Sequence, residues 1–206
     1  MAELPSRIKR LKRSFHPRLP DFLHYIKKES DKILDLGCGL LSNARYLAEK
    51  GFNVASVDLN LEYLLYDQKA FPQISPVCSD ICFLPFKSDL FGGTIIVDLL
   101  EHLPIKNVNQ ALEETIRVMQ TNSYIFLHIP LEGSFAYRFL RLVRKIWMRD
   151  PVHKHSYKYG EIKKIIGEFP IKIEEEWVNK RLRFFKNPNI SAVAATFVLR
   201  LKEKEG

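Results

Sequence analysis

The sequence lacks any apolar run close to the roughly 20 residues that a helix needs to span a bilayer. Its basic N-terminus is followed by no apolar stretch of signal-peptide length. Cysteine is scarce: Cys38, Cys78 and Cys82 are odd in number and form no Cys-x-x-Cys pair, which argues against a disulfide framework. We therefore expect a cytoplasmic protein with reduced cysteines.

Histidine is also sparse and poorly placed for a metal. His153 and His155 stand two residues apart, but no third ligand accompanies them, so we expect no metal site. The chain has no internal repeat and no linker. Its 206 residues are 46% hydrophobic and 27% charged, which fits one α/β domain, 1–206. Within it we expect a basic N-terminal arm over 1–20 and a variable, substrate-side insertion over 131–160.

Positive charge is what the sequence has in excess. The formal net charge is +8 at pH 7, and lysine and arginine concentrate in 1–20, near 135–150 and in 180–186. The apolar and basic residues near 135–150 alternate with helical period, which predicts a basic helical insertion. Such segments suit an anionic small molecule, a lipid-linked acceptor, a membrane surface or RNA. A solvated basic surface without any partner is an equally good interpretation.

The segment from Lys32 to Gly51 organises the rest of the chain. Residues 33–36 predict a strand that meets Gly37 and Gly39, and residues 42–50 predict a helix that ends at Gly51. Glycines in such a turn let the backbone approach a ligand, and N–H groups at the start of the helix favour an anionic group.

Two ligands compete for this turn. A dinucleotide turn needs the spacing G-x-G-x-x-G, but Ser42 stands at the third glycine. Asp35, at the end of the strand, would repel a pyrophosphate and attract a cationic amino group, such as that of S-adenosylmethionine. An ordinary turn with a buried aspartate remains open from this segment alone.

A second acidic residue is expected at the same edge of the sheet. Residues 53–57 predict a strand that ends in Asp58, whose carboxylate can accept both ribose hydroxyls of an adenosine. Leu59 can then lie on the adenine face. The next predicted strand contains Pro76, which cannot donate to a central ladder and so places this strand at the edge.

Two more acids follow the third and fourth predicted strands. Asp80 could bind the adenine amino group, with Ile81 on the ring. Residues 94–97 are wholly apolar and largely β-branched, which is typical of a central parallel strand, and Asp98 follows them. Ligands of open α/β sheets bind at this carboxyl edge.

Before the first strand, residues 21–28 predict a short helix with Asp21 as its N-cap.

Together these segments resemble the type 11 family of the class I S-adenosylmethionine-dependent methyltransferases. The resemblance runs from about residue 30 to 130, in the order and spacing of Asp35-Leu36-Gly37-Cys38-Gly39, Val57-Asp58, Ser79-Asp80-Ile81 with Leu84-Pro85-Phe86, Leu100-Glu101-His102-Leu103, and Arg117-Val118-Met119 before Ile129-Pro130. It implies a doubly wound, seven-stranded, mostly parallel sheet of Rossmann-like methyltransferase fold, and we expect the final strand, 193–201, to be antiparallel. It also implies S-adenosylmethionine as cofactor, bound by Asp35, Gly37, Cys38, Gly39, Asp58, Leu59, Asp80, Ile81 and Val97.

Two positions depart from the family pattern. Leu41 stands where the family has glycine or a small residue, so its side chain must point away or narrow the methionine pocket. Gly92 stands where the family often has an aspartate before the fourth strand, and we expect this to affect only the turn.

Methyl transfer needs a base only when the acceptor must lose a proton. His102 is the nearest candidate by position, with Asp98 and Glu101 as alternatives. A structural role for His102 at a helix start is equally compatible with the sequence. His128, within the fifth predicted strand, is interpreted as a core histidine with satisfied hydrogen bonds.

The acceptor class is narrowed by what is missing. The sequence has no Asn/Asp-Pro-Pro-Tyr run, which enzymes that methylate amino groups of adenine or glutamine use, and no Pro-Cys after the fourth strand for covalent attack on a pyrimidine. The leading hypothesis is methyl transfer to a small or lipid-linked anionic acceptor, in the cytoplasm or peripherally at a membrane. The alternatives are RNA methylation through the basic segments, and a catalytically silent module that binds lipid or nucleic acid.

Overall fold

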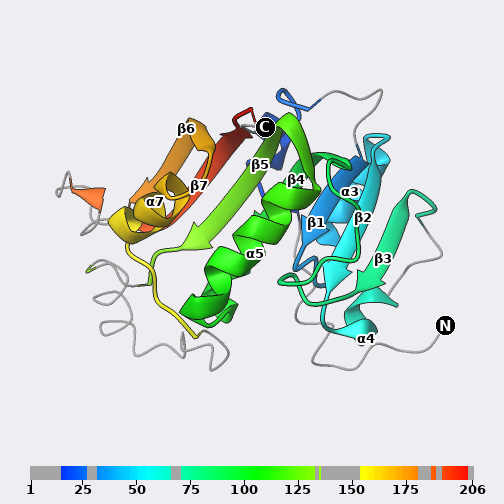
Figure 1. Ribbon diagram of the computed structural model, residues 1–206, viewed down its shortest axis with the longest axis horizontal. Coiled ribbons are helices and arrows are strands. Elements are labelled where there is room, and N and C mark those ends of the chain that lie inside the picture. The colour runs from blue at the N-terminus through cyan, green and yellow to red at the C-terminus, as the bar shows by residue number, and fades with distance from the viewer. Residues whose placement is uncertain are drawn as a thin grey trace.

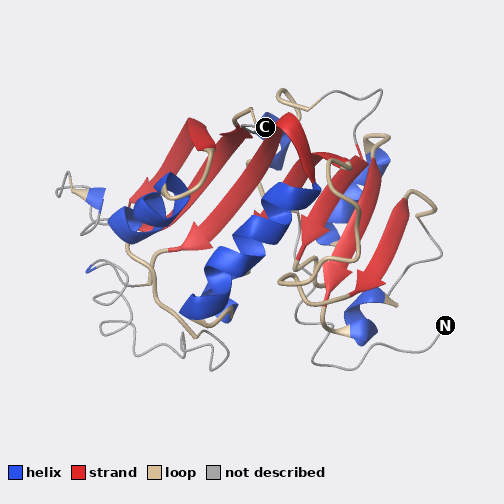
Figure 2. Cartoon of the chain, viewed as in Figure 1, coloured by secondary structure: helices blue, strands red, loops and turns tan. Residues whose placement is uncertain are grey.

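A single seven-stranded sheet with helices on both faces forms the protein (Figures 1 and 2). The computed structural model describes residues 15–26, 32–65, 71–132, 135, 154–180, 187–188 and 192–203. None of the helices in these ranges combines the length and apolar character that crossing a membrane requires.

The sheet has the strand order β3-β2-β1-β4-β5-β7-β6. The strands are β1 (Lys32–Leu36), β2 (Asn53–Asp58), β3 (Ile74–Cys78), β4 (Phe91–Val97), β5 (Met119–Pro130), β6 (Ile171–Lys180) and β7 (Ala192–Leu201). The pairs from β3 to β5 are parallel, and β7 lies antiparallel between β5 and β6. The predicted doubly wound, mostly parallel sheet is confirmed, with Pro76 on an edge strand and the last strand antiparallel.

The helices divide between the two faces. They are α2 (Leu19–Phe22), α3 (Ser42–Glu49), α4 (Leu61–Leu64), α5 (Ile105–Val118), α7 (Tyr159–Gly167) and a 3-10 turn, η2 (Leu100–His102). The apolar residues of α2 and α3 belong to one core cluster, and those of α5 and α7 belong to the other. In Figure 1, α5 and α7 lie in front of the sheet and α3 lies behind it.

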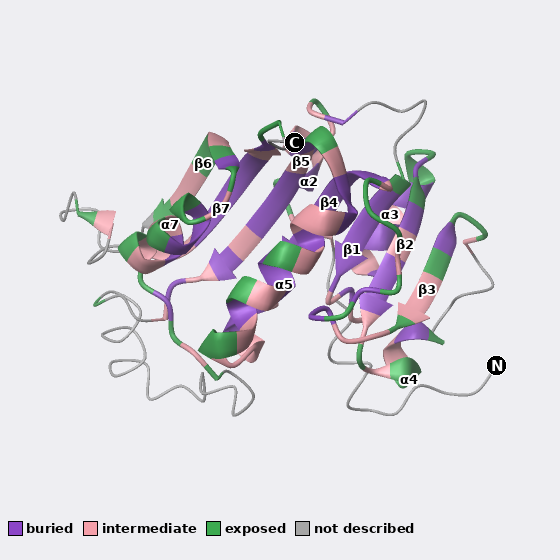
Figure 3. Cartoon of the chain, viewed as in Figure 1, coloured by how far each residue is buried: buried purple, intermediate pink, exposed green. Residues whose placement is uncertain are grey.

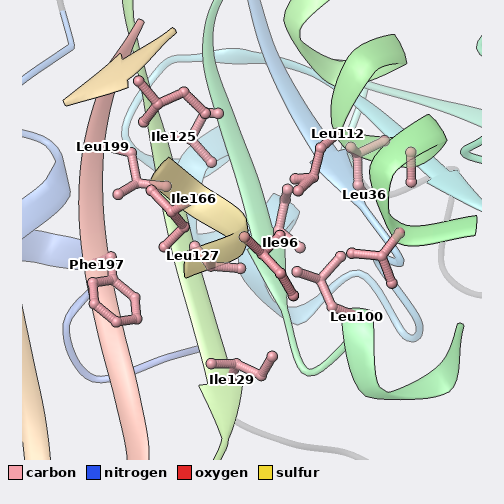
Figure 4. Packing of buried hydrophobic residues seen from close by; sticks show 14 of the residues in the cluster. Leu36, Ile96, Leu100, Leu112, Ile125, Leu127, Ile129, Ile166, Phe197 and Leu199 are labelled. Carbon is pink, nitrogen blue, oxygen red and sulfur yellow. The ribbon is translucent and has the colours of Figure 1, made fainter. Parts of the chain in front are cut away.

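The two clusters follow from strand alternation, because successive side chains of a strand point to opposite faces. On β5, Ile125, Leu127 and Ile129 pack with α5 and α7 (Figure 4), while Phe126 packs on the opposite face. Burial is deepest along the central strands, as Figure 3 shows.

The start of the chain differs from the sequence prediction. The predicted helix with Asp21 as N-cap is wrong in register: α2 begins at Leu19, its N-cap is Arg18, and Asp21 lies in its first turn. Pro20 explains the earlier start, because its fixed φ suits the first turn of a helix and its missing N–H costs nothing there.

Gly92 lies within β4 and not in the turn before it. The pairing of β4 with β5 shifts register between Phe91 and Gly93, so Gly92 stands at an irregularity of the ladder. A residue without a side chain suits such a position. The departure of Gly92 from the family pattern therefore affects the strand itself.

Gly93 gives a test of the packing behind the sheet. A Cβ added there would lie 2.9 Å from Ile26 Cγ2 and 3.0 Å from Ile33 Cδ1. We expect Gly93→Ala to lower the free energy of unfolding by about 1–2 kcal/mol, the usual effect of overpacking a core. Urea unfolding measures this, with Gly167→Ala as the matched control.

The control glycine lies at the end of α7, where an added Cβ meets nothing within 4 Å. Gly167→Ala should leave stability unchanged or raise it by up to about 1 kcal/mol through helix propensity. Equal stability of the two variants would contradict the packing described here.

Candidate cofactor site and reacting edge

The glycine turn between β1 and α3 is tied to the end of β2. The backbone N–H groups of Gly37 and Cys38 both donate to Val57 O, at 2.8 and 3.1 Å, and Gly39 N donates to Asp58 Oδ2 at 2.9 Å. These donors are therefore used within the chain. We expected these N–H groups to face an anionic ligand. The structure shows them bonded to the acidic end of β2 instead.

Gly37 is required here for two reasons. Its φ is +67°, and a Cβ would lie 2.7 Å from Leu99 Cδ1. Leu99, which follows β4, therefore covers the turn from the carboxyl ends of β4 and β5, the part of the sheet that we call the reacting edge. The turn is confined between β2 and the loop after β4.

Leu41 departs from the family pattern, and its burial shows where its side chain points. Its φ is +59°, a left-handed conformation that usually favours glycine, yet its side chain is 1% exposed and packs in the cluster of α2 and α3. The left-handed backbone costs roughly 1–2 kcal/mol in a residue with a Cβ. Burying a leucine offsets that cost. The side chain points into the core.

Asp35 is the most deeply buried acid at the site. It is 1% exposed, the backbone N–H of Ala44 hydrogen-bonds to its carboxylate, and its Oδ2 has no hydrogen-bond partner among the described residues. Burial, and secondarily the charge of Asp58, raises the pKa of Asp35 to about 8. An unsatisfied buried oxygen beside a second acid fits a ligand that brings N–H donors and positive charge.

Asp58 joins the turn to the helix that follows β2. Besides the bond from Gly39, its Oδ1 accepts from Asn60 N at 2.8 Å, and Asn60 caps α4 through Glu62 N at 2.9 Å. Residues 58–62 line an open hollow of about 560 Å³. Leu59 borders it and is 70% exposed, so its side chain offers apolar surface to a ligand in the hollow.

The loop after β3 presents a different residue from the one expected. Asp80 Oδ1 accepts from Cys82 N at 2.9 Å. Ile81 is buried in the core, whereas the ring of Phe83 is 68% exposed. The adenine contacts of Asp80 and Ile81 stay predictions, and Phe83 joins them as a candidate that sequence reasoning missed.

Helix α5 holds this loop in place. Arg117 donates to Phe86 O at 2.9 Å and Leu84 O at 3.0 Å, and it forms a two-point ion pair with Glu114. Glu114 in turn accepts from Leu84 N at 2.9 Å, and Gln110 donates to Cys82 O at 3.2 Å. The pair lies three residues apart on one helix face, a spacing that could have revealed it.

The reacting edge brings Asp98 to His128. Asp98 has φ +50° and directly follows Val97. Its N–H donates to His128 O at 3.2 Å, and its Oδ1 lies 3.7 Å from His128 Nε2. His128 Nδ1 is 2.8 Å from Thr196 Oγ1 on β7. His128, interpreted from sequence as a core residue, thus stands beside Asp98, one of the candidate bases named from the sequence.

His102 has a different setting from Asp98. It is the last residue of η2, and its N–H donates to Leu99 O at 2.9 Å. A structural role in this turn is the one the geometry supports directly. Its role as a base stays a prediction.

The remaining predictions fall largely outside the described residues. Residues 1–14, 136–150 and 181–186 carry most of the basic clusters and lie outside the described residues. Only residues 15–20 of the predicted basic arm are described, and the basic helical insertion stays a prediction. Within the described ranges no three His, Cys, Asp or Glu side chains are grouped as a metal site would need.

At Leu41 we expect a glycine variant to be more stable than an alanine variant, the reverse of the usual order. Leu41→Gly removes the buried side chain but also the left-handed strain, so we expect a loss of about 1–3 kcal/mol in the free energy of unfolding. Leu41→Ala keeps the strain and should cost more, about 2–5 kcal/mol. Denaturant titration compares the two, and a more stable Ala variant would contradict the left-handed backbone.

Asp35 makes stability depend on pH. Its folded-state pKa of about 8 exceeds the ordinary value of 3.8, so between these values the folded chain keeps a proton that the unfolded chain has lost. The free energy of unfolding should therefore fall as pH rises through this window, by a total on the order of a few kcal/mol.

Thermal unfolding of Asp35→Asn across this pH range checks the origin of that slope. The variant should lose much of the decline, whereas Asp21→Asn, at a half-exposed acid on α2, should keep it. Parallel curves for wild type and Asp35→Asn would show that Asp35 titrates normally.

Known proteins resemble this chain in sequence. Residues 34–127 match the family described as methyltransferase domain, type 11. Ubiquinone biosynthesis O-methyltransferase of Rickettsia typhi is 29% identical over 74% of this chain, and the chain spans 65% of the length of that protein.

Solved structures confirm the fold. A SAM-dependent methyltransferase from Methanosarcina mazei superimposes with a TM-score of 0.72 at 18% identity, over 93% of this chain and 100% of its own. One from Archaeoglobus fulgidus gives 0.69 at 19% identity, over 89% and 91%. The sequence match and the strand order agree: residues 34–127 match the methyltransferase domain of type 11, and the chain has the fold of the S-adenosylmethionine-dependent methyltransferases.

Proposed function

We propose that the protein transfers a methyl group from S-adenosylmethionine to a small-molecule acceptor. The arrangement of Asp35, Gly39 and Asp58 is the observation that carries this proposal. It gathers two carboxylates at a turn where the N–H groups of Gly37, Cys38 and Gly39 are already bonded, and so favours a cationic ligand over a pyrophosphate. The name of the Rickettsia typhi relative, an O-methyltransferase, supports a small-molecule acceptor.

The chain itself would bind and orient the cofactor and the acceptor, and it would exclude water from them. When bound, S-adenosylmethionine supplies a methyl group on a sulfonium, an excellent leaving group for direct in-line displacement. Asp35 would hold the amino group, and Asp58 would accept from the ribose hydroxyls once its bond to Gly39 is given up or shared. Leu59 and Phe83 offer exposed apolar surface to the adenine.

The other acceptor classes rest on segments outside the described residues. A lipid-linked or otherwise anionic acceptor, a peripheral membrane contact and RNA all depend on the basic segments near the N-terminus, 135–150 and 180–186. They stay predictions. The catalytically silent alternative depends on Leu41 narrowing the pocket; the burial of Leu41 among the residues of α2 and α3 supports an active site instead.

Calorimetric titration of S-adenosylmethionine tests the proposal. We expect micromolar binding, weakened at least about 10-fold in Asp58→Ala because a charged hydrogen-bond acceptor is lost. Glu168→Gln, at an exposed acid beyond α7, is the matched control and should bind as wild type does. Binding should also tighten as pH rises toward 8, because a cationic ligand favours ionised Asp35.

The outcomes separate clearly. Absence of heat with folded wild-type protein would refute the cofactor assignment and with it the function. Binding that Asp58→Ala leaves unchanged would place the cofactor elsewhere than at the end of β2.

A further inference from the structure

A polar cluster lies at the carboxyl edge of the central strands, on the face that carries α3. It consists of Asp98 after β4, His128 on β5, Thr196 on β7 and His16 from the segment before α2. His128 lies between the others: its Nδ1 is 2.8 Å from Thr196 Oγ1, its Nε2 is 3.7 Å from Asp98 Oδ1, and its ring centroid is 4.3 Å from that of His16.

The segment that carries His16 is anchored on both sides of the cluster. Phe15 stacks on Tyr46 of α3 with ring centroids 4.0 Å apart, and His16 N donates to Asn43 Oδ1 at 2.9 Å. On the other side the His16 ring meets Phe126 edge-on at 5.2 Å. Residues 15 and 16 thus cross from α3 to β5 and cover one face of the His128 ring.

The distances leave His128 Nε2 available. Nδ1 is within hydrogen-bonding distance of Thr196, whereas 3.7 Å to Asp98 is too long for a hydrogen bond but close enough for charge attraction. With its proton on Nδ1, donated to the Thr196 hydroxyl oxygen, His128 presents the Nε2 lone pair. The His128 side chain is 18% exposed, so part of the imidazole is open to solvent.

We propose that His128 is the catalytic base, and that it takes a proton from a neutral hydroxyl group of the methyl acceptor. This inference rests on the proposed function. The acceptor oxygen forms a bond to the methyl carbon with its own electron pair, the carbon–sulfur bond breaks, and its pair goes to sulfur. The hydroxyl proton moves to His128 Nε2, so the sulfonium charge is replaced by an imidazolium charge.

The surroundings fit this proton transfer. Burial lowers the pKa of His128, and the charge of Asp98 opposes that effect. Burial, then His128 and Arg18, lowers the pKa of His16 to about 4. Both imidazoles are therefore neutral near pH 7, and the imidazolium formed on His128 gains the attraction of Asp98. Among the described residues, Asp98 and His16 act on His128, and Arg18 acts on His16.

The same charges select the acceptor. A carboxylate 3.7 Å from the base repels an anionic reacting group, whereas a neutral phenol or alcohol meets no such penalty and needs a base to become a good nucleophile. Any anionic part of the acceptor must lie away from Asp98. The inference thus narrows the anionic acceptor of the sequence analysis to one whose reacting group is neutral.

Catechol is a suitable probe, being a small neutral molecule with adjacent phenolic hydroxyls. We expect wild type to methylate it with S-adenosylmethionine and His128→Gln to lose about 100-fold or more in kcat. Thr196→Val should lower kcat at unchanged KM, because it removes the group that orients the ring. His24→Gln, at an exposed histidine beyond α2, is the matched control and should behave as wild type does.

Nitrogen NMR of the histidine rings gives a readout that needs no turnover. Near neutral pH the wild-type His128 should carry its proton on Nδ1, and Thr196→Val should lose that preference. The kcat/KM of wild type should decline at a pH below the ordinary histidine pKa of 6.5, and Asp98→Asn should move this decline to lower pH. Melting curves confirm that each variant is folded.

The possible results distinguish this inference from the proposed function. If S-adenosylmethionine does not bind, the function itself fails. If it binds but wild type leaves catechol unmethylated, the neutral hydroxyl acceptor is overturned. If His128→Gln keeps wild-type turnover, or if the His128 proton resides on Nε2, the base is another group.

Discussion

The site depends on the hydrogen bonds that tie the glycine turn to the end of β2. Three successive N–H groups, from Gly37, Cys38 and Gly39, donate to Val57 O and Asp58 Oδ2. Backbone donors of a buried turn must find partners, and here the neighbouring parallel strand supplies them. The turn is consequently rigid before any ligand arrives. The charge of the turn is set by Asp35 and Asp58, because its amides are bonded within the chain.

This arrangement stores an electrostatic cost. Asp35 is buried close to Asp58 with one oxygen unsatisfied, so its ionised form is unfavourable in the free protein. Buried groups of this kind concentrate at functional sites, because a ligand of opposite charge relieves the cost when it binds. The fold can carry it because the two core clusters on either side of the sheet are extensive and well packed.

Much of the fold was predictable because its signals are local. The apolar run of β4, the glycines of the turn, Pro76 on β3 and the acids after the strands each state a requirement of a single segment. The site residues that escaped prediction depend on contacts distant in sequence. Arg117 clamps a loop more than thirty residues before it, and His128 acquires its setting from Thr196, 68 residues further along the chain. The start of α2 was missed for a local reason, the proline in its first turn.

The antiparallel insertion of β7 has a consequence for how this molecule can diversify. Because β7 runs against β5, it brings Thr196 to the carboxyl edge of the central strands. There both Thr196 and His16, which precedes α2, contact His128. The glycine turn, by contrast, takes its hydrogen bonds from Val57 and Asp58 at the end of β2. Substitutions at His16 or Thr196 can therefore alter the surroundings of His128 while the glycine turn keeps its sequence. The surroundings of His128 and the acidic end of β2 can therefore change independently within one fold.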